Sequence, residues 1–121
     1  MSTPESNVKK RVRTILSDYK GYVITPSTGG YGSSGVPDIV ACIDGIFVGI
    51  ECKAKGNKPT KLQLKNLQQI VDAGGFAAVV DETGLGILSL KLSVTFDTSA
   101  IVVPNSVLDY TAQHEKDKDQ D

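Results

Sequence analysis

The sequence predicts an α/β fold in which helices flank a mixed β-sheet. Two segments place apolar residues at helical spacing, one near the N-terminus and one over residues 60–73. Between them, Asp44-Gly45, a dipeptide typical of a two-residue β-hairpin, joins two apolar runs. A further apolar run, residues 76–80, follows the second helical segment. The predicted core order is therefore α-β-β-β-α-β, within a single domain over residues 1–110.

The first helix is predicted to begin at Thr3-Pro4-Glu5, because threonine is a favoured N-cap and proline is favoured at the first helical position. Glu5 lies one turn before Val8, so its side chain is expected on the inward face of the helix. The helix is expected to end before Gly21. Its apolar stripe consists of Val8, Val12, Ile15, Leu16 and Tyr19.

Three strands are predicted next, over residues 22–25, 36–43 and 46–54, with a Gly- and Ser-rich loop over residues 26–35. The Asp44-Gly45 turn sets the register, because a two-residue loop pairs Ile43 with Ile46. Counting outward from that pair places Asp38 opposite Glu51, with both side chains on the same side of the sheet.

The second helix is predicted to end at Gly74-Gly75, and residues 76–80 are expected to form a strand buried on both faces. The alternating pattern after residue 84 predicts further strands over residues 85–90, 94–96 and 101–103. Residues 111–121 are expected to form a charged, disordered tail.

Composition excludes several classes of protein. The chain has no apolar run near the ~20 residues that span a membrane, and its N-terminus lacks the apolar stretch of a signal peptide. We therefore expect a soluble, cytoplasmic protein. The two cysteines, Cys42 and Cys52, lie in apolar runs and are expected to be buried, reduced thiols, and the single histidine, His114, lies in the tail. These residues supply neither a zinc–thiolate site nor a histidine-based catalytic triad.

The net charge of −1 conceals an uneven distribution. Residues 1–65 contain ten Lys and Arg against five Asp and Glu, whereas residues 66–121 contain three against nine. A basic N-terminal half is compatible with a polyanionic partner, although charged faces are also common where only solvent is bound.

The predicted pairing of Asp38 with Glu51 indicates a site that binds a metal ion. Two opposed carboxylates repel each other, and a cation such as Mg²⁺ would remove that repulsion. Strand alternation places Lys53 on the same side as Glu51. In phosphodiester hydrolysis, Asp38 and Glu51 would hold the metal, and Lys53 would orient the attacking water or neutralise developing charge. The alternative is a pair of ordinary strand-end charges with a slipped register.

The residues Gly35-Val36-Pro37-Asp38 and Glu51-Cys52-Lys53 resemble the PD…ExK signature of the PD-(D/E)xK nucleases, and more narrowly the virus-type replication-repair nuclease (VRR-NUC) family. The resemblance covers roughly residues 3–82, with Cys52 where valine is common. It implies a restriction-endonuclease-like fold, DNA cleavage dependent on Mg²⁺ or Mn²⁺, and a homodimer similar to Holliday-junction resolvases that acts on branched DNA in repair.

The resemblance and the charge pattern add accessory candidates. Glu5 is a candidate third metal ligand, or simply a first-turn acid favoured by the helix dipole. Gln63 is a candidate catalytic residue, or the partner of Thr60 in a capping box. Candidates for DNA contact, with a solvated face as the alternative, are Lys9, Lys10, Arg13 and Lys55. Tyr31 is a further candidate that could stack on a base, the alternative being that its Gly-rich loop is a connector without a role.

Three rival functions remain open at this point. One is a catalytically silent DNA-binding module of the same fold, which the intact Asp38, Glu51 and Lys53 disfavour. Another is a sequence-specific restriction-type endonuclease, for whose recognition elements the chain has little room. The third is a phosphate-binding α/β protein, which would require a Gly-rich loop that leads into a helix.

Overall fold

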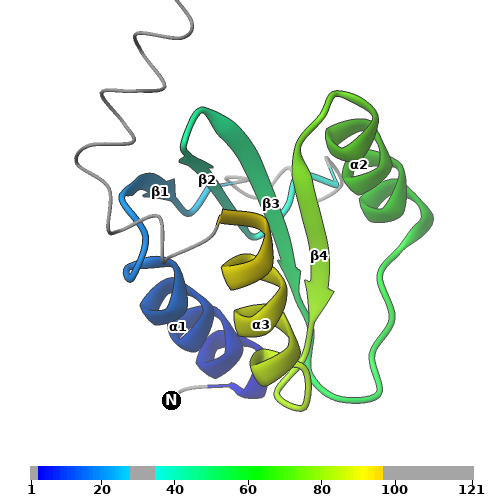
Figure 1. Ribbon diagram of the computed structural model, residues 1–121. Helices are drawn as coiled ribbons and strands as arrows, with labels where there is room; N and C mark the ends of the chain where they lie inside the picture. Colours follow the sequence, from blue (N-terminus) through cyan, green and yellow to red (C-terminus); the bar gives the residue numbers. More distant parts are fainter. Residues whose placement is uncertain (1–2, 28–34, 97–121) are drawn as a thin grey trace, which may run out of the picture.

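The computed structural model describes residues 3–27 and 35–96, which form a mixed four-stranded sheet flanked by three helices (Figure 1). The sheet order is β1-β2-β3-β4. The first three strands are antiparallel neighbours, and β4 pairs with β3 in parallel. The predicted α/β class and core order are confirmed. The elements are α1 (Pro4–Leu16), β1 (Gly21–Ile24), β2 (Ile39–Ile43), β3 (Ile46–Cys52), α2 (Lys61–Asp72), β4 (Phe76–Val80) and α3 (Leu85–Phe96).

The β2–β3 hairpin has the predicted register. Asp44 and Gly45 both adopt positive φ, 53° and 78°, as the two central residues of a type I′ turn require. Ile43 pairs with Ile46, and the ladder continues to the pair Ile39–Ile50. Asp38 therefore lies immediately before β2, one residue beyond the last backbone pair, rather than inside a longer strand.

The two faces of the sheet are covered by different helices. The helices α1 and α3 lie next to each other across one face, whereas α2 packs against β3 and β4 from the other (Figure 1). At Gly49 a Cβ atom would stand only 2.5 Å from Ile70 Cδ1, so α2 approaches the sheet closely there. The main core lies on the first face and contains Val8, Val12, Leu16, Ile39, Ala41, Ile43, Val48, Ile50, Cys52, Val80, Leu85, Leu88, Leu92 and Phe96.

The prediction of strands over residues 85–90 and 94–96 is wrong, because this segment forms α3. Every second residue from Leu88 to Phe96 is apolar, which suggests a strand. The same sequence also has apolar residues at helical spacing, and these are the ones buried: Leu85, Leu88, Leu92 and Phe96. A helix here covers the sheet face beside α1, and this tertiary packing outweighs the local alternation. The remaining apolar side chains, Ile87, Leu90 and Val94, are exposed.

Two burial predictions also need correction. Cys52 is buried as expected, but Cys42 is exposed on β2. The strand β4 is only half-buried, because it lies at the sheet edge and Val79 is 41% exposed. Tyr31, the strand predicted over residues 101–103 and the tail over residues 111–121 lie outside the described residues. No helix in the described part of the chain is both long enough and apolar enough to cross a membrane.

Candidate active site

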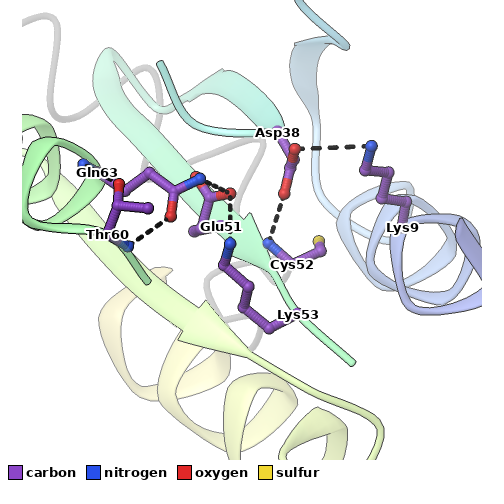
Figure 2. Close-up of polar contacts among 7 residues, drawn as sticks. All are labelled: Lys9, Asp38, Glu51, Cys52, Lys53, Thr60 and Gln63. Carbon is purple, nitrogen blue, oxygen red and sulfur yellow. Dashed lines mark hydrogen bonds and ion pairs between the residues drawn. The ribbon is translucent and has the colours of Figure 1, made fainter. Parts of the chain in front are cut away.

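Asp38 is fixed by the backbone of the neighbouring strand. Its Oδ2 atom accepts a hydrogen bond from the Cys52 backbone N–H at 2.8 Å (Figure 2). This bond bridges β2 and β3 just where their regular pairing ends at Ile39 and Ile50. The carboxylate is thereby held beside the end of β3, and Asp38 stands next to Glu51 as the hairpin register predicted.

Glu51 is the buried acid of this group, with an exposed fraction of only 1%. One carboxylate oxygen, Oε1, accepts a hydrogen bond from Gln63 Nε2 at 3.0 Å. The other, Oε2, is buried and has no hydrogen-bond partner within the described residues. Burial and then the adjacent Asp38 raise the pKa of Glu51 to about 8, although Lys53 acts in the opposite direction. At neutral pH the metal-free site therefore retains a proton on Glu51.

Gln63 forms the capping box that the sequence suggested, and its side chain also contacts the buried acid. Its Oε1 atom accepts a hydrogen bond from the Thr60 backbone N–H at 2.8 Å, which completes the capping box of α2. Its Nε2 atom simultaneously donates to Glu51 (Figure 2). A single side-chain amide thus connects the start of α2 to the buried acid of β3.

Lys53 follows the end of β3 and remains on the Glu51 side. Its Nζ atom lies 4.0 Å from Glu51 Oε1, and its side chain is 14% exposed. Its backbone N–H donates to the Val80 carbonyl at 2.9 Å, so the parallel contact with β4 continues past Cys52 and restrains the lysine backbone. The ammonium group is therefore held near the acids and is partly shielded from water.

Glu5 joins Asp38 and Glu51 from a different element. It lies in the first turn of α1, which begins at the N-cap Thr3 with Pro4 in its first turn. Each of the three acids offers a carboxylate oxygen, and these oxygens all lie within 4.8 Å of one another. An all-oxygen donor set suits a hard cation such as Mg²⁺ or Mn²⁺. The Oε2 atom of Glu51 also fits a role as a metal ligand, because a buried oxygen without a hydrogen-bond partner is costly. This group of acids could hold a metal ion.

Comparison with known proteins identifies the family. The sequence model of the archaeal Holliday junction resolvase (Hjc) family matches residues 6–101, most of the chain. The chain belongs to this family. One solved structure described as a VRR_NUC domain is 24% identical, with a TM-score of 0.57, and the match covers 75% of this chain and 95% of that chain. The comparison with curated proteins gave no significant match.

Membership of the Holliday junction resolvase family makes this chain a nuclease of the PD-(D/E)xK superfamily, and the VRR_NUC structure agrees with it in fold. The matched span includes Asp38, Glu51, Lys53 and Gln63. Glu5 lies immediately before this span, so its place in the site depends on the carboxylate geometry alone.

Lys9 was expected only as a candidate for DNA contact, and the structure places it beside the acids. Lys9 Nζ lies 3.5 Å from Asp38 Oδ1, so Lys9 contacts the acid group rather than standing apart on the helix surface (Figure 2). The spacing of Lys9 from Glu5 in the sequence could have indicated this position. Lys9 is four residues after Glu5, and residues at this separation share a helix face.

The other candidates for DNA contact within the described residues lie outside the cluster of acids. Lys10 and Arg13 are exposed on α1 and line a shallow depression of about 530 Å³ together with Thr14, Ser17 and Val23. Lys55 is exposed in the loop between β3 and α2, where it interacts electrostatically with Asp81.

Proposed function

We propose that this protein is an Mg²⁺- or Mn²⁺-dependent endonuclease that hydrolyses phosphodiester bonds of branched DNA, such as a Holliday junction. The observation that carries this proposal is the meeting of Glu5, Asp38 and Glu51 within 4.8 Å, in a chain of the Holliday junction resolvase family. Lys53 adds an ammonium group beside these acids.

Glu5, Asp38 and Glu51 would hold the metal ion through carboxylate oxygens. When bound, a divalent cation supplies Lewis acidity toward the phosphate and lowers the pKa of a coordinated water. Binding requires Glu51 to lose its proton, because a carboxylate coordinates in its ionised form. The Gln63 amide keeps Glu51 Oε1 oriented, which leaves the unpartnered Oε2 available.

The protein side chains act on the phosphate and the water. Lys53 is placed to orient the attacking water or to neutralise charge that develops on the phosphate oxygens. Asp38 keeps its orientation because the Cys52 N–H holds its Oδ2 atom. Outside the acid cluster, Lys10 and Arg13 on α1 and Lys55 in the loop between β3 and α2 would contact the phosphate backbone. Such contacts position DNA without reading its sequence.

We infer further that the enzyme acts as a homodimer, because resolving a junction requires two cuts and a two-fold assembly supplies two sites. The outer face of α3 supports this inference. Ile87, Leu90 and Val94 are 60%, 64% and 74% exposed and lie at helical spacing on this face. An apolar stripe of this kind is typical of a surface that pairs with a second copy.

The test is cleavage of labelled four-way junction, flap, duplex and single-stranded DNA in Mg²⁺, Mn²⁺ or EDTA. The proposal expects metal-dependent cutting that favours the branched substrates and is lost in Asp38→Ala and Lys53→Ala. Lys20→Ala, at an exposed lysine outside the site, serves as the control and should remain active. Junction binding without cutting in any metal would instead indicate a catalytically silent DNA-binding module. Equal cutting of all substrates would contradict the selectivity for branched DNA.

A further inference from the structure

The ion pair between Lys9 and Asp38 introduces a second lysine to the site. Lys9 Nζ approaches Asp38 Oδ1 at 3.5 Å, while Asp38 Oδ2 is engaged by the Cys52 N–H. The Asp38 side chain is only 19% exposed and the Lys9 side chain 36%, so the pair is partly shielded from solvent. Lys9 reaches the acids from α1, and Lys53 reaches them from just after the end of β3 (Figure 2). The metal-free site thus holds an ammonium group on the Asp38 side and another on the Glu51 side.

The formal charges of the site show what a metal ion would change. The carboxylates of Glu5, Asp38 and Glu51 contribute −3 when ionised, and Lys9 and Lys53 contribute +2. With all three acids ionised, a bound divalent cation would bring the sum to +1, which matches a single phosphodiester charge. The cation and the Lys9 ammonium would then both lie against Asp38, where like charges repel each other.

We propose that Lys9 is the counter-ion of the metal-free site, and that it leaves Asp38 when a divalent cation binds and contacts the phosphate of the DNA instead. A lysine suits this exchange, because its ammonium is a point charge on a flexible four-carbon stem. Its backbone remains fixed on α1, which also carries Glu5. Lys9 is then a positioning residue for Asp38 before metal binding and a phosphate contact afterwards.

The inference rests on the proposed metal-dependent function, and it predicts opposite effects on metal affinity and on cleavage. Removing the Lys9 charge removes a competitor of the metal, so Mn²⁺ should bind the DNA-free protein more tightly. The partly exposed ion pair suggests a decrease in Kd of about fivefold. Cleavage of the junction should fall nonetheless, because a phosphate contact is lost. A merely structural lysine would weaken both properties together.

The experiment measures Mn²⁺ binding by calorimetry without DNA, and junction cleavage at saturating Mn²⁺, for Lys9→Met, Lys9→Gln and Lys9→Arg. Lys9→Gln keeps a hydrogen-bond donor toward Asp38 but removes the charge. It replaces Lys9→Met in both measurements if Lys9→Met does not fold. Lys20→Met removes an equal charge from an exposed position and should leave the Mn²⁺ affinity unchanged. Lys9→Arg should restore an affinity close to that of the wild type.

Tighter Mn²⁺ binding with slower cleavage in Lys9→Met or Lys9→Gln would support the exchange. A second outcome is that the wild type binds Mn²⁺ and cuts junctions, while the variants bind Mn²⁺ with unchanged or weaker affinity. This outcome would overturn the exchange of Lys9 but not the proposed function. A wild type without saturable Mn²⁺ binding would overturn both this inference and the proposed metal-dependent function.

Discussion

Gln63 donates a hydrogen bond from Nε2 to Glu51 Oε1 at 3.0 Å, and thereby connects the capping box of α2 to the buried acid. The cap and the contact with Glu51 can be separated by mutation. Thr60→Ala removes the hydroxyl that accepts from the Gln63 backbone N–H at 3.1 Å but retains the Gln63 amide. Gln63→Ala removes the side-chain oxygen that accepts from the Thr60 N–H, together with the contact with Glu51, and leaves the bond from the residue 63 N–H to the Thr60 hydroxyl.

We expect either substitution to cost about 1 kcal/mol of the free energy of unfolding, because each removes one of the two hydrogen bonds of the capping box. Only Gln63→Ala should also reduce junction cleavage, by about tenfold or more, because Glu51 loses its orienting donor. Denaturant titrations and single-turnover cleavage provide the two readouts. If Thr60→Ala slows cleavage as much as Gln63→Ala does, the contact between Gln63 and Glu51 has no role of its own.

The raised pKa of Glu51 predicts a specific dependence of stability on pH. This pKa is about 8 in the folded metal-free protein, against an ordinary value of 4.5. Between these values the folded state binds the extra proton, so the free energy of unfolding should fall as pH rises from about 4.5 to 8. The expected loss is at most about 1.4 kcal/mol per pH unit.

Glu51→Gln carries an amide that does not ionise in this pH range. The variant should therefore not show the fall in the free energy of unfolding that comes from Glu51. In EDTA, thermal unfolding of the wild type and Glu51→Gln should therefore diverge from pH 5 to pH 9, with the variant more stable at the alkaline end. A difference between the two proteins that stays constant with pH would mean that Glu51 ionises normally in the fold.

Gly49 lies where α2 meets the sheet. A Cβ atom there would stand 2.5 Å from Ile70 Cδ1 and 3.1 Å from Pro37 Cγ. We expect Gly49→Val to destabilise the protein by about 1–3 kcal/mol through overpacking. Adding Ile70→Ala should recover part of this loss, because it removes the nearer of the two obstacles. Chemical denaturation of the two single variants and the double variant gives the coupling energy between positions 49 and 70. If the changes in the free energy of unfolding are strictly additive, the two positions are not in contact.

The exposed face of α3 predicts a self-association surface. Leu90→Glu should raise the dimer Kd by at least about tenfold, because it places a charge within the apolar stripe. Ser89→Glu introduces the same charge at an exposed polar position next to the stripe and should leave the dimer intact. Sedimentation equilibrium measures both variants. A monomeric wild type, or a Leu90→Glu dimer of normal affinity, would rule out this surface.

Local sequence signals were sufficient for the part of the fold that builds the site. The Asp44-Gly45 turn fixes its own geometry, so the register that brings Asp38 to Glu51 followed by counting. The Thr3 N-cap of α1 and the capping box of α2 depend on residues within one helical turn and were equally accessible to sequence reasoning.

The features that were missed depend on packing between distant segments. The apolar alternation of residues 88–96 fits a strand as well as a helix, and only the uncovered sheet face beside α1 selects the helix. The spacing of Lys9 from Glu5 places both on one helix face, but the contact with Asp38 also depends on where α1 crosses the end of β2. The exposure of Cys42 likewise depends on how far the helices extend over the sheet.

The central claim is that Glu5, Asp38 and Glu51 form a divalent metal site. The most direct measurement is anomalous diffraction from crystals grown with Mn²⁺. We predict a strong anomalous peak at about 2.0–2.3 Å from carboxylate oxygens of these three residues, and loss of that peak in Asp38→Ala. Well-ordered crystals at saturating Mn²⁺ with no peak at these carboxylates, or with a peak only elsewhere, would contradict the claim.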